Sequence, residues 1–203
     1  READTPDDEA EEELEMSDYY QTDAFEDEEG AVLSYDVLPV VNNGGTLEIN
    51  MGSLTLLSLV EEQVSEFRER NITLILSKDD VSWKIPPANF IPGNATLRFY
   101  EGVPTGVESQ TGDVTSIYTT SIYQKGARHF IYPSWMEITF NLEKQQANLD
   151  AAELEGYAWD KREKEWFQTI LEGDEGELVV STRHATAVGV FNPDEIIEEA
   201  DQD

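Results

Sequence analysis

The chain has 203 residues, and its 44 acidic residues against 13 Lys and Arg give a formal net charge of −31 at pH 7. A charge of this size repels phosphate backbones and anionic lipid heads, which argues against nucleic acid or a membrane surface as a partner. The absence of cysteine excludes a disulfide framework, a thiolate metal site and a cysteine nucleophile. We therefore expect cationic partners, such as a basic protein or divalent ions.

The acidic residues concentrate at the two ends of the chain. Residues 1–30 contain fifteen acids and one Arg, and residues 193–203 contain six acids and no base, which leaves a net charge of −11 for residues 31–192. Acidic runs with few apolar side chains bury too little surface to offset chain entropy. We predict an acidic tail or docking segment at 1–30, a folded domain at 31–192 with two sub-lobes meeting near 102–115, and an acidic tail at 193–203.

Targeting signals are not apparent in the sequence. No apolar stretch approaches the about 20 residues of a membrane span, so we expect no span in this chain. No signal peptide opens the chain. Because Arg1 is not a natural initiator, we expect a fragment or a processed form.

Short runs of alternating apolar and polar residues follow one another along the domain. Such alternation is typical of strands, because successive side chains point to opposite faces. Short strands at this spacing indicate a sandwich or a barrel, and we predict a mainly β fold, an antiparallel β-sandwich of about ten strands. The runs are 31–38, 45–51, 72–76, 81–85, 95–100, 116–123, 136–142, 153–159, 165–171 and 178–191.

One helix is predicted at about 58–70. Ser58 followed by Glu61 matches a capping box, in which each side chain satisfies the other's backbone N–H at a helix start. Apolar residues then recur at helical spacing, and Asn71 is a typical C-terminal stop. Before this helix, residues 42–45 (Asn-Asn-Gly-Gly) are typical of a connection between two strands.

The last apolar run contains His184-Ala185-Thr186, the stretch with candidate chemistry. An imidazole with a pKa of ~6.5 accepts protons near neutral pH. If His184 takes the Thr186 hydroxyl proton, the oxygen can attack the Ala185 carbonyl and form an ester that water hydrolyses. In the alternative, His184 and Thr186 share one face of an edge strand and only make hydrogen bonds. We favour the alternative and predict no catalytic residue beyond this hypothesis.

Other candidate sites have a functional and a structural interpretation. Trp159 and Trp166 suit either a sugar-stacking platform or the core, and the core is favoured. His129 has no matching ligand set and is predicted to be structural. No nucleotide-binding, hydrolase or zinc-protease motif is present, so we predict no cofactor.

Two acidic turns and two sequons complete the candidates. Asp79, Asp80, Asp174 and Glu175 are weak candidates for calcium, because their turns offer oxygen ligands without the spacing of an EF-hand loop. Asn71 and Asn94 each begin an Asn-x-Thr acceptor pattern for N-glycosylation.

The order of features also resembles known β-sandwich families. The stretch 122–130 (Ile-Tyr-Gln-Lys-Gly-Ala-Arg-His-Phe), Pro133 and 136–140 (Met-Glu-Ile-Thr-Phe) resemble a segment of the sandwich found in netrin receptors, ankyrins and many bacterial cell-surface proteins. The C-terminal layout, with Tyr157, Trp166 and His184-Ala185-Thr186, resembles the proteolysis motif of the GAIN domain in adhesion receptors. The chain lacks the cysteines of that motif, and Ala185 stands where the bacterial pattern has an aromatic residue.

The resemblance implies an extracellular or cell-surface location. We predict a non-enzymatic structural or interaction module of a cell-surface or secreted assembly, whose partners are other copies of itself or neighbouring surface proteins. The alternatives are a module that cleaves itself between Ala185 and Thr186, and a carbohydrate-binding module.

Overall fold

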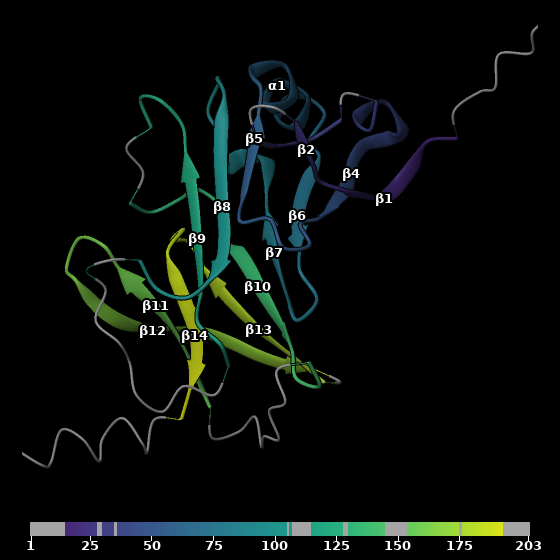
Figure 1. Cartoon of the computed structure of the whole chain (residues 1–203). Helices are drawn as coiled ribbons and strands as arrows, with labels where there is room; N and C mark the ends of the chain where they lie inside the picture. Colours follow the sequence, from purple (N-terminus) through teal and green to yellow (C-terminus); the bar gives the residue numbers. More distant parts are fainter. Residues whose placement is uncertain are drawn as a thin grey trace, which may run out of the picture.

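The computed structural model describes residues 15–27, 30–34, 36–104, 106, 115–127, 130–144, 154–174 and 176–192. These residues form one continuous mixed sheet of 14 strands that is nearly closed into a barrel (Figure 1). The strands lie side by side in the order β1-β4-β6-β7-β10-β13-β12-β11-β14-β9-β8-β5-β3-β2.

The elements are short and follow one another closely along the chain. They are β1 (Ser17–Asp23), β2 (Phe25–Asp27), β3 (Gly30–Val32), the 3-10 turn η1 (Leu38–Val40), β4 (Val41–Asn50), β5 (Leu56–Leu59), α1 (Glu61–Glu69), β6 (Thr73–Ser77), β7 (Val81–Ile85), η2 (Pro87–Asn89), β8 (Ala95–Glu101), β9 (Tyr118–Tyr123), β10 (Met136–Asn141), β11 (Glu155–Asp160), β12 (Glu165–Asp174), β13 (Glu177–Thr182) and β14 (Ala187–Phe191).

The two halves of this sheet face each other across an aromatic core. Trp83 of β7 lies 5.9 Å from Phe99 of β8, ring centre to ring centre, and Phe99 lies 5.5 Å from Tyr118 of β9. Tyr118 in turn meets Phe140 of β10 at 6.1 Å. Trp83, Phe99 and Phe140 are fully buried. Each such aromatic side chain removes a large apolar area from water, so these contacts hold the halves together.

Strand β12 connects the two halves on one side of the fold. Its residues Glu165 to Thr169 pair with β11, and its residues Ile170 to Asp174 pair with β13. A strand that changes partner midway turns a corner between sheets. The expected sandwich of two separate antiparallel sheets is therefore wrong, because β12 joins both halves into one sheet.

The N-terminal strands bring the two remaining edges together. β1 pairs with β4, β2 pairs with β3, and only Ala24 separates β1 from β2. The Ala24 N–H donates to the Asn50 carbonyl at 2.9 Å. Residues 17–27 of the expected acidic segment 1–30 therefore belong to the sheet, whereas residues 1–14 and 193–203 lie outside the described residues.

The strand number and direction also differ from the prediction. The described residues form fourteen strands instead of about ten, and β1–β4, β4–β6 and β3–β5 pair in parallel. β1, β2 and β5 were missed. The first two lie in an acidic stretch whose side chains are mostly exposed, so no apolar alternation marks them.

The predicted turn at residues 42–45 is an irregularity within β4. The register of β1 against β4 jumps from Ser17 opposite Val41 to Tyr19 opposite Thr46. Gly44 there has a φ of +77°, a conformation that favours glycine. The glycine pair therefore lies in a bulge within one strand, and not in a connection between two strands.

Helix α1 is confirmed, but its predicted cap is wrong. Ser58 lies in β5, and the N-cap is Val60. The Gln63 side chain accepts the Val60 N–H at 3.1 Å, and Asn94 Oδ1 accepts the Glu61 N–H at 2.7 Å. A distant side chain thus supplies a cap that local sequence cannot reveal. Asn71, with a φ of +52°, follows the helix end as predicted.

The predicted run 178–191 is two strands instead of one. β13 lies between β10 and β12, and β14 lies between β11 and β9. Residues 183–186 connect them and cross from one half of the sheet to the other. The structural interpretation placed His184 and Thr186 on an edge strand, and this is wrong, because both residues lie in the connection between β13 and β14.

In the described part of the chain, no helix has the length and apolar character needed to cross a membrane.

Candidate functional site

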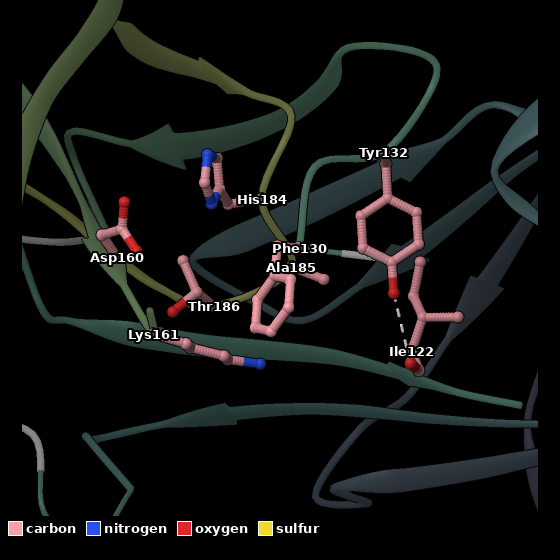
Figure 2. Close-up of a pocket in the computed structure, with 8 residues that line it drawn as sticks. All are labelled: Ile122, Phe130, Tyr132, Asp160, Lys161, His184, Ala185 and Thr186. Carbon is pink, nitrogen blue, oxygen red and sulfur yellow. Dashed lines mark hydrogen bonds between the residues drawn. The ribbon is translucent and has the colours of Figure 1, made fainter. Parts of the chain in front are cut away.

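The connection between β13 and β14 forms one wall of a pocket of about 130 Å³. We call it the crossover pocket (Figure 2). Three chain segments besides this connection contribute to it: the end of β9, the β9–β10 loop, and the turn after β11. The lining residues are Ile122, Phe130, Tyr132, Asp160, Lys161, His184, Ala185 and Thr186.

Hydrogen bonds hold the connection between β13 and β14, residues 183–186, which we call the crossover. The Tyr132 N–H donates to the Arg183 carbonyl at 2.8 Å, and Arg183 Nε donates back to the Tyr132 carbonyl at 2.7 Å. The Thr186 N–H donates to Thr120 Oγ1 at 2.9 Å, and the Thr120 hydroxyl donates to the Thr186 carbonyl at 3.0 Å. The β9–β10 loop and β9 therefore hold both ends of the crossover.

The hydroxyl of Thr186 is an exception in this network. Thr186 is 1% exposed, and its Oγ1 atom has no hydrogen-bond partner. Buried hydroxyls are normally paired, because a donor without an acceptor retains its full desolvation cost. Since Thr186 lines the crossover pocket, a group that enters the pocket could satisfy this hydroxyl.

His184 is held by its backbone and by a ring contact. Its N–H donates to Thr182 Oγ1 at 3.1 Å, and its imidazole lies 4.8 Å from the Phe167 ring. Burial lowers the pKa of His184, and Lys161 and Arg183 act in the same direction, whereas Asp160 opposes them. The imidazole is therefore neutral near pH 7.

Asp160 and Lys161 place opposite charges at the pocket. Asp160 Oδ1 accepts the backbone N–H groups of Arg162 at 2.8 Å and Glu163 at 3.0 Å. These bonds, the one from Glu163 first, lower the pKa of Asp160. Lys161 is exposed but lines the pocket, and burial lowers the pKa of its amine. The sequence offered no signal for either residue beyond a charged turn.

The arrangement lacks the proton transfer that self-cleavage requires. Thr186 Oγ1 has no hydrogen-bond partner, so His184 does not accept its proton in this conformation. In Figure 2 the hydroxyl oxygen of Thr186 points away from the imidazole of His184. The structure thus brings both residues to one pocket without joining them as nucleophile and base.

The two candidate tryptophans lie in and beside the core. Trp159 is 4% exposed. Its ring lies edge-on to Trp166, 5.6 Å away, and Trp166 lies edge-on to Phe191 at the same distance. Trp159 cannot present an open ring face to a sugar, because its ring is buried.

Of the candidate calcium residues, the structure describes the side chains of Asp79 and Asp80, and each of these has another partner. Asp80 accepts the Tyr118 hydroxyl with both carboxylate oxygens, at 2.7 and 2.9 Å. Asp79 pairs with Lys144 at 3.4 Å. The backbone of Asp174 lies opposite that of Glu177 in the β12–β13 hairpin, and Glu175 lies outside the described residues. Within the described ranges, no group of three or more acidic or His side chains could hold a metal.

The two sequon asparagines, Asn71 and Asn94, are both exposed. His129 lies outside the described residues.

Four exposed apolar side chains lie at the end of β9 and in the loop that leads to β10, and one of them, Phe130, lines the crossover pocket. Tyr123, Phe130, Ile131 and Trp135 are 66%, 58%, 55% and 51% exposed, and all come from the end of β9 and the loop that leads to β10. We call these four side chains the apolar face. The sequence did not predict the apolar face. Its residues are of the same types as core residues, and only the structure shows that they are exposed.

Buried amides anchor the loop that carries the apolar face. Gln124 Oε1 accepts the Ile91 N–H at 2.9 Å, and Gln124 Nε2 donates to the Ile91 carbonyl at 2.7 Å. Asn89 exchanges a similar pair of bonds with the Ser134 backbone, at 3.1 and 2.9 Å. The loop is thereby tied near both ends to the segment after β7.

No protein-family model matches this chain, and no curated protein sequence matches it. The class of this protein is therefore described by its fold and its site. It is a mainly β protein with one mixed sheet, a crossover pocket and an exposed apolar face that shares Phe130 with that pocket.

Proposed function

We propose that this chain is a non-enzymatic interaction module of a cell-surface or secreted assembly, which docks a protein partner on the apolar face. The observation that carries the proposal is the exposure of Tyr123, Phe130, Ile131 and Trp135, each more than half accessible. Large apolar side chains that gather on a surface are typical of protein-binding sites, and aromatic residues dominate binding energy there.

The anchoring of the loop supports the same proposal. A docking surface binds more tightly when its backbone is ordered before the partner arrives, because less conformational entropy is lost. Gln124 and Asn89 are 4% and 1% exposed and use their amides to fix this loop. Buried amides of this kind hold the exposed side chains of the loop in one arrangement.

Site-specific photo-crosslinking in the cells that produce the protein tests the proposal. A photoreactive aromatic residue replaces Trp135, and in a matched control it replaces Ile170, which is 47% exposed on β12. We expect one discrete crosslinked product from position 135 and none of the same mass from position 170. Identical products from both positions, or none from position 135, would contradict the proposal. Digestion of the chain by protease added to intact cells tests the surface location.

A second candidate, self-cleavage between Ala185 and Thr186, is favoured by the partnerless hydroxyl of Thr186. The hydroxyl oxygen would attack the Ala185 carbonyl carbon while the amide nitrogen of Thr186 takes a proton, and water would then hydrolyse the ester. His184 would first have to turn toward Thr186. Mass spectrometry under denaturing conditions decides this: an intact 22.9 kDa chain without a product that starts at Thr186 eliminates the candidate.

A further inference from the structure

The segments around the crossover pocket differ in charge from the rest of the chain. The described residues 122–127, 130–135, 160–165 and 183–186 contain five of the 13 Lys and Arg residues against three acids. In a chain with a net charge of −31, this is a locally cationic surface. Complementary charge steers encounter and excludes partners of the wrong sign. An acidic partner therefore fits this surface better than any other part of the molecule.

The polar groups of the pocket match one carboxylate. The buried Thr186 hydroxyl is a donor without an acceptor, and Lys161, whose ammonium group is a second donor, lines the same cavity. A carboxylate accepts several hydrogen bonds at once, so it could take both donors. Asp160 also faces the cavity, but its Oδ1 atom already accepts two backbone N–H groups of the adjacent turn.

The other walls suit the stem of an acidic side chain. Ile122, Phe130 and Tyr132 supply apolar surface beside the polar groups. The cavity volume of about 130 Å³ accommodates a carboxylate with its methylene groups. Phe130 belongs to both the pocket and the apolar face, so an acidic residue in the pocket would place neighbouring residues against that face.

We propose that the crossover pocket receives an Asp or Glu side chain from the acidic N-terminal segment, residues 2–16, of a second copy of this chain. The inference rests on the proposed function and names its partner. This segment carries nine acids together with Leu14 and Met16, which can pack on the apolar face. Strand β1, which follows the segment, lies on the opposite side of the molecule from the β9–β10 connection (Figure 1). Docking of one copy on the next therefore forms a head-to-tail contact.

Fluorescence anisotropy with a labelled peptide of residues 1–16 and the full-length chain tests the proposal. We expect saturable binding that weakens with added salt. Lys161→Gln should weaken binding about tenfold, since it removes a charge-assisted hydrogen bond. Thr186→Val should weaken it about fivefold, since it removes only the hydroxyl. Lys144→Gln, at an exposed lysine that pairs with Asp79, is the matched control and should leave binding unchanged.

The variants separate loss of binding from loss of folding. Thr186→Val keeps the side-chain shape and removes a partnerless hydroxyl, so its thermal midpoint should equal or exceed that of the parent chain. A peptide with Glu11, Glu12 and Glu13 replaced by Gln should bind more weakly than the parent peptide. Sedimentation of the full-length chain should show association that grows with concentration and that Lys161→Gln reduces.

Three results would overturn the inference. They are an absence of saturable binding, binding that Lys161→Gln and Thr186→Val leave unchanged, and a chain that stays monomeric at all concentrations while the peptide binds. In the last case the segment docks on its own chain. None of these results affects the photo-crosslink expected at position 135, so failure of the inference is distinguishable from failure of the proposed function.

Discussion

Two segments connect the halves of the sheet, and different forces hold them. β12 passes from β11 to β13, and its half-buried apolar side chains pack against the core: Trp166 lies edge-on to Trp159 and Phe191, and Phe167 and Leu171 pack on the core cluster. The β1–β2 segment passes from β4 to β3, but most of its side chains are exposed.

The difference separates side-chain burial from backbone pairing as causes of structure. β12 gains most from apolar burial, which the sequence displays as an apolar run. β1 gains from a ladder of backbone bonds with β4, which any sequence can form where an open edge is available. A strongly acidic sequence therefore does not prevent a strand when a neighbouring edge supplies its hydrogen bonds.

The largest expected effect comes from a matched pair of phenylalanines. Phe191 of β14, whose ring contacts Trp166 of β12, is fully buried, whereas Phe25 of β2 is 46% exposed. Phe191→Ala should lower the free energy of unfolding by about 3–5 kcal/mol, because it leaves a cavity beside Tyr157 and Trp166. Phe25→Ala should cost about 1 kcal/mol or less. Equal losses in urea-induced unfolding would show that side-chain burial holds both segments equally.

A smaller effect is expected where β1 approaches β4. A Cβ atom on Gly45 would lie 2.8 Å from the Asn42 carbonyl oxygen and 2.9 Å from the Asp18 carbonyl oxygen. Both are backbone atoms, so Gly45→Ala must push β1 away, at a cost of about 1–3 kcal/mol. Hydrogen exchange should accelerate in residues 17–23 more than in the core strands.

Gly156 of β11 provides the control for this substitution. A Cβ atom there would meet the side chains of Leu171 and Val180 at 3.4–3.5 Å, which is ordinary contact. Gly156→Ala should therefore leave exchange in β1 unchanged. If Gly45→Ala also leaves it unchanged, the close approach at Asp18 does not position β1.

The same contrast explains what the sequence could predict. The strand at 81–85 was located at its exact bounds, since Val81, Trp83 and Ile85 alternate and are all buried. β1 and β2 carry no such alternation. The cap on Glu61 comes from Asn94, far along the chain, so local pattern could not identify it.

The candidate site was predictable only in part. His184 and Thr186 were candidates because an imidazole can act as a base and a hydroxyl as a nucleophile, and the structure places both at one pocket. Their position on a crossover was not predictable, because the run 178–191 is apolar throughout and shows no break. Asp160 and Lys161 come close to His184 and Thr186 because β11 pairs with β14. This pairing is between distant parts of the chain, and no pattern in a single sequence reveals it.

The smallest effect concerns pH and the contact between His184 and Phe167 of β12. Burial lowers the pKa of His184 below its ordinary value of 6.5. Above that value the imidazole is neutral in both the folded and unfolded chain, so it adds no pH dependence. As the pH falls below it, the unfolded chain takes up the proton more readily, and the folded state loses stability. His184→Phe keeps a ring against Phe167 but cannot titrate.

The thermal midpoint should therefore fall less for His184→Phe than for the parent chain between about pH 7.5 and about pH 5. Protonation of carboxylates affects both chains alike, so the difference between them isolates His184. Because Phe167 lies on β12, the protection of backbone amides against hydrogen exchange, corrected for the intrinsic rate at each pH, should fall in β12 of the parent chain before it falls in β1. The opposite order would show that acid acts first on the exposed N-terminal strands, and that the half-buried side chains of β12 do not set the response of the fold to pH.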